Sequence, residues 1–218
     1  MYILKGKEKV LNKYLFFTPE QYILFEKLYS MIADTPINLT RITAKDDFYL
    51  KHILDSIYFI KYLDADFQTG IDVGTGGGFP GIILAIYFRN KNFYLVDSVK
   101  KKCDFVAKFI AELGLKNAYV INSRVENIKD IKADIIFSRG VGKAEEILRF
   151  TKNVSHETTA YLFYKGENID SEINTAIKYI KKRGLIYDNV RVQEPILRSY
   201  LYFNSANYIR LRRKKNID

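Results

Sequence analysis

The stretch GIDVGTGGGFPG at residues 70–81 constrains the fold of this chain more than any other. A short apolar run around Ile71 and Val73 leads into four glycines, and Pro80 then begins a helical pattern. Glycine tolerates positive φ angles and lets a ligand approach the backbone, which a side chain would prevent. A glycine turn between a strand and a helix directs free backbone N–H groups toward a ligand. The segment therefore predicts a strand–turn–helix unit that binds a ligand at its turn.

An acidic residue supplies the second signal. Asp97 ends the apolar run NFYLVD and lies 23 residues after Gly74. In doubly wound nucleotide-binding folds, a carboxylate at about this distance holds the ribose hydroxyls of the ligand by charge-assisted hydrogen bonds. Together the turn and Asp97 predict a cofactor that contains a nucleoside. A tight turn without a ligand is the alternative, and Asp97 argues against it.

The glycine spacing disfavours a dinucleotide cofactor. The pattern G-x-G-x-x-G fits only at Gly76, Gly78 and Gly81, which is one turn later than a dinucleotide fingerprint prefers. A second mononucleotide-binding half is also missing from the pattern of predicted elements. Dinucleotide binding therefore stays the weaker alternative.

From Thr69 onward, short apolar runs alternate with helical patterns, which predicts an α/β fold with a mainly parallel sheet covered on both faces. We expect strands at 69–73, 93–97, 118–122, 133–138, 159–164, 185–192 and 200–211, and helices at about 80–89, 99–113, 142–152 and 169–182. No helix separates the last two strands, so they should form a terminal antiparallel hairpin. Seven strands with this ending are typical of methyltransferases that use S-adenosylmethionine, whereas a dehydrogenase more often continues with strand–helix–strand units.

The segment before residue 66 is predicted to be helical. Thr18, Pro19 and Gln21 form a helix start with a capping box, and a second helix is expected from about Asp46 to Leu63. We therefore predict an N-terminal helical extension over residues 1–65 and one compact methyltransferase domain over residues 66–218.

The charge balance indicates a polyanionic partner. Among 218 residues there are 35 Lys and Arg against 25 Asp and Glu, a formal net charge of +10. Such an excess favours nucleic acid as the partner, with a lysine-rich proteome bias as the alternative. Cys103 is the single cysteine and lies on the apolar stripe of its predicted helix, so we expect a buried thiol in a reducing compartment. With no apolar stretch of membrane-spanning length and no secretory signal, we expect a cytoplasmic protein.

Five blocks in one order carry a specific resemblance. They are KHILDS at 51–56, DVGTGGGFPG at 72–81, LVDS at 95–98, SRVE at 123–126 and SRG at 138–140. The chain resembles the ribosomal RNA small-subunit methyltransferase G family, also called glucose-inhibited division protein B, from Asn38 to Gly166. The resemblance implies a Rossmann-like class I methyltransferase with a seven-stranded, mostly parallel sheet. It also implies transfer of a methyl group from S-adenosylmethionine to N7 of one guanine in small-subunit ribosomal RNA.

The resemblance also implies a set of cofactor contacts. These fall on Gly74 and Phe79 in the glycine turn, on Val125 and Glu126 after the third strand, and on Arg139 at the end of the fourth. From the residues themselves we add Gly76 and Asp97. The complete expected cofactor set is therefore Gly74, Gly76, Phe79, Asp97, Val125, Glu126 and Arg139. Arg139 is expected to bind either the cofactor carboxylate or an RNA phosphate.

Two positions depart from the family pattern without touching the cofactor set. Gly140 stands where alanine is more usual, which loosens the turn after Arg139. Lys51 stands where arginine is common, which weakens any bidentate contact there.

The expected RNA contacts are basic residues near the predicted sheet edge. We expect Lys100, Lys101 and Lys102 to neutralise phosphates, and His52 beside Asp55 to shape the guanine pocket, with an ordinary helix-surface pair as the alternative. The second basic run, from Arg210 to Lys215, is expected to be a loose tail. The aromatic rings that stack on the target base are hypothesised to be Phe79 or Tyr164.

Neither a metal-spaced cluster nor a nucleophile–base pair is visible, and we expect a monomer without metal. N7 of guanine already carries an in-plane lone pair, so the expected reaction needs no catalytic base. Two alternatives stay open at this point. One is a methyltransferase that acts on protein or a small molecule, and the other is a noncatalytic RNA-binding or ribosome assembly factor that retains the fold.

Overall fold

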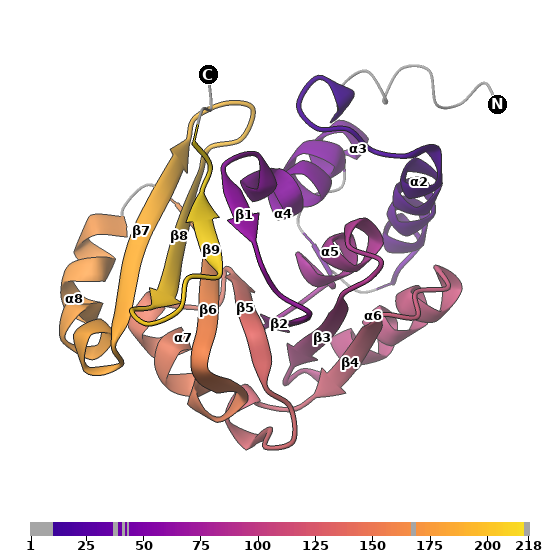
Figure 1. Ribbon diagram of the computed structural model, residues 1–218. Helices are drawn as coiled ribbons and strands as arrows, with labels where there is room; N and C mark the ends of the chain where they lie inside the picture. Colours follow the sequence, from indigo (N-terminus) through magenta and orange to yellow (C-terminus); the bar gives the residue numbers. More distant parts are fainter. Residues whose placement is uncertain (1–10, 37–38, 41, 43, 167–168, 216–218) are drawn as a thin grey trace.

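The computed structural model describes residues 11–36, 39–40, 42, 44–166 and 169–215. A seven-stranded sheet in the order β4-β3-β2-β5-β6-β8-β7 forms its centre (Figure 1). Only β8 runs against its neighbours, so the predicted parallel sheet with a terminal antiparallel hairpin is confirmed. The strands are β2 Thr69–Val73, β3 Asn92–Asp97, β4 Ala118–Asn122, β5 Ala133–Arg139, β6 Ser155–Lys165, β7 Leu185–Val192 and β8 Arg198–Ser205.

Helices cover both faces of this sheet (Figure 1). The N-terminal helices lie on one face with α5 Gly81–Tyr87 and α6 Lys100–Glu112, while α7 Ala144–Phe150 and α8 Ile169–Lys182 lie on the other. A buried apolar cluster fills the space on each side. Because both faces are covered, the central strand β2 is buried along almost its whole length. Since β2, β3, β4 and β5 are parallel, their carboxyl ends lie at the same edge of the sheet.

The first described helix begins as the sequence predicts. In α2 Pro19–Ala33, the Thr18 hydroxyl accepts a hydrogen bond from the Gln21 amide at 3.3 Å, and the Gln21 side chain accepts one from the Thr18 amide at 2.9 Å. These two bonds satisfy amide groups that have no partner within the helix.

The second predicted helix is present but is not one regular α-helix. It consists of α3 Lys45–Phe48, a wide π-helical segment Tyr49–Leu54, α4 Asp55–Ile57 and a 3-10 turn Tyr58–Lys61. Local π-helical turns are common at functional sites, because they shift which side chains share a face. The π-helical segment ends just before Asp55, which is 1 % exposed.

The predicted last strand at 200–211 is wrong beyond residue 205. The chain turns after β8, and β9 Leu211–Arg213 pairs antiparallel with β1 Leu63–Ala65 in a separate two-stranded sheet. The buried side chain of Asn204 causes the break, because it donates to the Leu211 carbonyl at 2.8 Å and accepts from the Leu211 amide at 2.9 Å. The domain division at residue 65 stays a prediction, and β1 at this boundary pairs with the end of the chain.

Candidate active site

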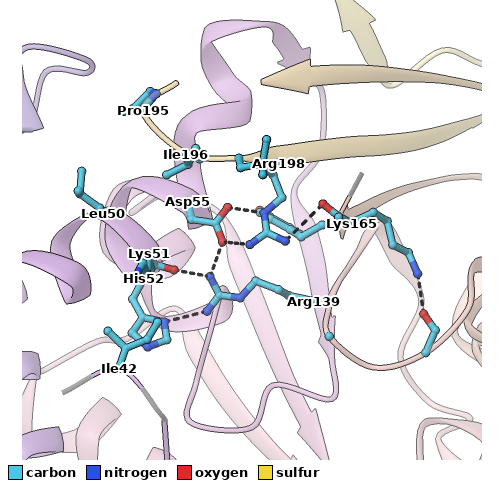
Figure 2. A pocket seen from close by; sticks show the side chains of 15 residues that line it. Ile42, Leu50, Lys51, His52, Asp55, Arg139, Lys165, Pro195, Ile196 and Arg198 are labelled. Carbon is cyan, nitrogen blue, oxygen red and sulfur yellow. Dashed lines mark hydrogen bonds and ion pairs between the residues drawn. The ribbon is translucent and has the colours of Figure 1, made fainter. Parts of the chain in front are cut away.

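Two cavities open at the carboxyl edge of the sheet, and both border Gly140. The smaller cavity, of about 310 Å³, is lined by the ends of β2, β3 and β5 and by the loop after β4. The larger cavity, of about 760 Å³, lies between the end of β5, the π-helical segment and residues 195–198 (Figure 2). The segment from Arg139 to Gly142 therefore forms a wall that the two cavities share.

The glycine turn follows β2 with positive φ angles at Gly74, Gly76 and Gly78. Most of its amide groups already donate hydrogen bonds within the chain, which corrects the expectation of free N–H groups. The Gly74 amide donates to the Val96 carbonyl at 2.8 Å, and the Gly76 amide donates to Asp97 Oδ2 at 2.9 Å. Six amides of the turn donate within the chain in this way: those of Gly74, Thr75, Gly76, Gly78, Phe79 and Gly81. Because these donors are engaged, the turn offers little to a pyrophosphate, which is a further argument against a dinucleotide.

Asp72 on β2 is a buried acid for which the sequence predicted no role. Its Oδ2 accepts hydrogen bonds from the Thr75 hydroxyl at 2.6 Å and from the Gly81 amide at 2.9 Å. Its Oδ1 is buried and has no hydrogen-bond partner among the described residues. Burial raises the pKa of this carboxyl to about 6, against the lowering effect of its hydrogen bonds. Asp72 thus holds both ends of the turn.

Asp97 lies at the end of β3, as the sequence predicts, and lines the smaller cavity. Its Oδ1 accepts from the Val99 amide at 2.9 Å, while Oδ2 holds the Gly76 amide. Each carboxylate oxygen has a further lone pair available to a hydroxyl donor. Cys103 is buried, as expected, and its thiol donates to the Asp97 carbonyl at 3.3 Å.

The structure brings four of the predicted cofactor residues together in the smaller cavity: Gly74, Asp97, Val125 and Glu126. Gly76 does not line this cavity, but its amide donates to Asp97, which does. Val141 closes over Gly74, since a Cβ atom added to Gly74 would lie 2.4 Å from Val141 Cγ2. Glycine is therefore required at this position by packing as well as by its φ of +67°.

Arg139 turns away from the smaller cavity and lines the larger one (Figure 2). Its Nη1 donates to Asp55 Oδ2 at 3.0 Å and to the Lys51 carbonyl at 3.1 Å. On the other side of Asp55, Arg198 forms a two-point pair, with Nε on Oδ1 and Nη2 on Oδ2, both at 2.7 Å. The Asp55 side chain is 2 % exposed, so one buried carboxylate fixes two guanidinium groups at the cavity wall.

His52 supports Arg139 from the π-helical segment. Its Nδ1 lies 3.0 Å from Arg139 Nη2, its Nε2 lies 2.6 Å from the Thr40 hydroxyl, and its ring stacks on Phe79 at a centroid distance of 4.0 Å. Burial and the nearby charge of Arg139 lower the pKa of His52 to about 3. A neutral ring accepts from Arg139 at Nδ1 and donates from Nε2 to Thr40. The predicted RNA contact of His52 stays a prediction. In the structure its ring contacts Arg139 and Phe79.

The geometry does not favour Phe79 or Tyr164 as the ring that stacks on the target base. Phe79 is 5 % exposed and one face of its ring is taken by His52. Tyr164 borders the larger cavity but is 2 % exposed, and its hydroxyl donates to the Ser56 carbonyl at 2.7 Å. Both rings support the wall of the cavity from within the core.

The larger cavity is lined by basic and apolar side chains. Four basic side chains and one carboxylate line it, together with an apolar rim that includes Ile42, Leu50 and Ile196. The basic residues are Lys51, Arg139, Lys165 and Arg198. Neither Lys165 nor Arg198 was among the predicted site residues. Arg198 meets Asp55 across 143 positions of sequence, a contact that no local pattern signals.

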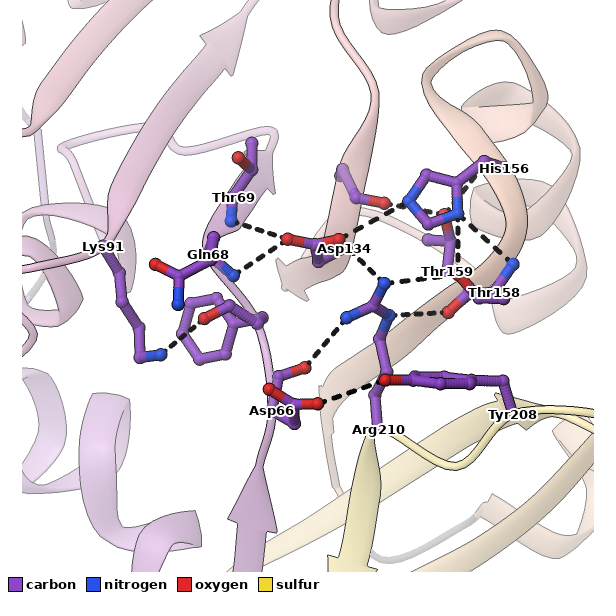
Figure 3. Close-up of polar contacts among 12 residues, drawn as sticks. Asp66, Gln68, Thr69, Lys91, Asp134, His156, Thr158, Thr159, Tyr208 and Arg210 are labelled. Atoms are coloured by element: carbon purple, nitrogen blue, oxygen red, sulfur yellow. Dashed lines mark hydrogen bonds and ion pairs between the residues drawn. The ribbon is translucent and has the colours of Figure 1, made fainter.

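The two basic clusters behave differently. Lys100 and Lys101 are exposed and Lys102 is half-buried in the first turn of α6, just after the edge of the smaller cavity. The C-terminal run is not the expected loose tail, because β9 forms part of it and Arg210 is anchored (Figure 3). Arg210 Nη2 pairs with Asp134 Oδ1 at 2.9 Å and its Nε donates to the Thr158 carbonyl at 2.8 Å.

Within the described part of the chain, no group of three or more His, Cys, Asp or Glu residues is placed to hold a metal ion. No described helix has the length and apolar character that crossing a membrane would require. Asn38, the first residue of the resemblance, lies outside the described residues.

Solved structures with the same sheet define the class of the fold. A methyltransferase from Pyrococcus furiosus matches with a TM-score of 0.59 and 13 % identity, covering 86 % of this chain and 99 % of that chain. The M. jannaschii protein TYW2, solved in complex with AdoMet, matches with a TM-score of 0.57 and 17 % identity, covering 82 % and 81 %. The chain thus has the Rossmann-like fold of methyltransferases.

The family follows from sequence comparison. A family model described as rRNA small subunit methyltransferase G matches residues 21–197. Proteins named ribosomal RNA small subunit methyltransferase G are similar in Carboxydothermus hydrogenoformans, at 35 % identity over 76 % of this chain and 74 % of that protein, and in Mesoplasma florum, at 34 % over 81 % and 77 %. The chain belongs to the rRNA small subunit methyltransferase G family, which confirms the resemblance.

Proposed function

We propose that this protein transfers a methyl group from S-adenosylmethionine to N7 of a guanine in small-subunit ribosomal RNA. The proposal rests mainly on one observation: two cavities with different linings lie side by side and share Gly140. One has side chains suited to a nucleoside cofactor, and the other is lined by four basic side chains. Family membership supplies the substrate class.

The residues of the smaller cavity fit the cofactor. Asp97 and Glu126 supply carboxylates suited to hydroxyl groups or to a cationic sulfonium compound, and Arg124 adds one guanidinium. Gly74 leaves room for Val141, which lines the same cavity, and Val125 supplies an apolar surface. Bound S-adenosylmethionine would supply an electrophilic methyl group at this edge of the sheet.

The larger cavity suits a nucleotide of an RNA chain. Its cationic side chains favour phosphates, and its apolar rim favours a base. Arg139 and Arg198 are held in place before any substrate arrives, which reduces the entropy lost on binding. We assign both arginines, with Lys165, to RNA binding and positioning.

The chain needs no general base for this reaction, because N7 of guanine has a lone pair without a proton. His52 is not expected to act as a base, because its Nδ1 accepts a hydrogen bond from Arg139 and its pKa is lowered to about 3. The contribution of the protein is orientation, which places N7 roughly 3 Å from the methyl carbon. Action as a monomer in the cytoplasm belongs to the same proposal.

The test is methylation of unmodified small ribosomal subunits and of stripped ribosomal RNA with labelled S-adenosylmethionine. The modified base is mapped by cleavage chemistry specific for N7-methylguanine, with Arg139→Met as the matched inactive variant. Label at one guanine N7 supports the proposal. Label in ribosomal protein, or at another atom of the RNA, would overturn it. No label with intact binding of RNA would favour an assembly factor.

A further inference from the structure

Phe150 is an exposed aromatic ring that lines the smaller cavity. It ends α7 and is 43 % exposed. All phenylalanines of the chain lie in its described part, and Phe16 is the only other exposed one. Exposure of so large an apolar ring forgoes the free energy of burial, unless a ligand covers the ring. Among the described residues, no aromatic ring packs against Phe150 and no cation lies over it, although its neighbour Arg149 covers Tyr179.

The position of this ring is fixed relative to the loop after β4. Asn153, three residues after Phe150, donates from its side chain to the Glu126 carbonyl at 2.5 Å. Thr151 donates from its hydroxyl to the Ile147 carbonyl at 2.6 Å, which closes the end of α7. The turn that carries Phe150 and the turn that carries Val125 and Glu126 are therefore joined, and both line one cavity.

We propose that Phe150 stacks on the adenine ring of the cofactor, with Asn153 as the residue that positions it against the Val125–Glu126 turn. The inference rests on the proposed use of S-adenosylmethionine. A purine presents a flat π-face, and an aromatic side chain is a partner that binds such a face without hydrogen bonds. Asp97, which lines the same cavity, is left for the ribose hydroxyls.

A single-tryptophan variant tests the contact directly. The chain contains no tryptophan, so Phe150→Trp introduces one fluorophore into the cavity. Adenosine and S-adenosylmethionine should both quench its emission in a saturable way, and methionine should not. Phe16→Trp, at the other exposed phenylalanine, is the control that should stay unchanged. Quenching by RNA and not by adenosine would assign Phe150 to the substrate and overturn the inference.

Calorimetry gives the second measurement. Phe150→Ala should weaken S-adenosylmethionine binding about ten-fold, and Phe150→Tyr should retain affinity near that of the wild type, because the phenol keeps the π-face. Circular dichroism of each variant shows whether it is folded. If the wild type binds no S-adenosylmethionine, the proposed function fails. If the wild type binds it, while Phe150→Ala binds equally and Phe150→Trp is not quenched, only the role of Phe150 fails.

Discussion

Arg139 at the end of β5 donates a hydrogen bond to Nδ1 of His52, across 3.0 Å and 87 positions of sequence. The other terminal nitrogen of Arg139 is taken by Asp55 and by the Lys51 carbonyl. With three acceptors on one guanidinium, Arg139 is fixed at the wall between the two cavities. Its orientation therefore depends on a neutral histidine.

Two substitutions of His52 separate its hydrogen bond from its stacking. His52→Phe keeps a ring against Phe79 but removes the acceptor for Arg139, and the loss of a bond to a charged donor costs about 1.5–3 kcal/mol. We expect the kcat of methyl transfer to fall about ten-fold or more, because 1.4 kcal/mol corresponds to a factor of ten. His52→Asn keeps an acceptor near the place of Nδ1 and should lose less. Equal losses in both variants would contradict this role for the hydrogen bond.

The lowered pKa of His52 predicts a pH dependence of stability. The folded protein holds the ring neutral down to a pKa of about 3, whereas the unfolded chain protonates it near 6.5. The stabilising contribution is therefore complete above pH 6.5 and is lost as the pH falls toward 3. Between pH 6.5 and 5, the wild type should lose about 2 kcal/mol of unfolding free energy that His52→Asn does not lose. Urea unfolding at these two pH values measures the difference. Asp72, present in both proteins, cancels in the comparison.

Much of the parallel sheet could be predicted because its signals are local. The strand before Gly74, the acid at Asp97 and the cap at Thr18 each depend on neighbours in sequence. The break after β8 depends on a buried amide side chain, Asn204, that folds the chain back onto Leu211. An asparagine within a strand-like run of sequence does not by itself predict such a hydrogen bond.

The site was predicted less completely, for a related reason. Gly74, Asp97, Val125 and Glu126 meet because the carboxyl ends of parallel strands share an edge. The engaged amides of the turn and the contact between Asp55 and Arg198 arise from tertiary packing. Arg198 follows a loop and begins an antiparallel strand, so neither spacing nor periodicity places it beside a helix 143 positions away.

The buried carboxylate of Asp55 should matter far more to stability than an exposed one. Asp55→Ala leaves Arg139 and Arg198 without their shared counter-charge, and breaking a buried pair costs about 3–5 kcal/mol. Asp104 forms an exposed pair with Lys100, with side chains 60 % and 78 % exposed, so Asp104→Ala should change stability by less than about 0.5 kcal/mol. Urea unfolding of both variants is the measurement. Similar small losses would show that Asp55 does not hold the two arginines.

Gly74 should be intolerant of a methyl group because of Val141. Gly74→Ala places a Cβ 2.4 Å from Val141 Cγ2, at a φ of +67°. Gly114 has a φ of +64° with open space around it, so Gly114→Ala carries the same backbone strain without the clash. We expect a clear loss of S-adenosylmethionine affinity only in Gly74→Ala, with partial recovery in the double variant Gly74→Ala/Val141→Ala. Calorimetric titration of the three variants tests this, and unchanged binding by Gly74→Ala would contradict it.

The lysines at the start of α6 should contribute to RNA affinity through salt-dependent contacts. Lys100 and Lys101 lie next to the edge of the smaller cavity, whereas Lys181 and Lys182 end α8, and both pairs are exposed. Each lysine–phosphate contact adds about 0.7–0.9 to the slope of log affinity against log salt. Replacing Lys100 and Lys101 by alanine should therefore lower the slope by about 1–2, and replacing Lys181 and Lys182 should leave it nearly unchanged. Filter binding of small-subunit RNA across a salt series compares the two. An equal reduction from both pairs would mean that the lysines act through net charge alone and make no contact at this edge.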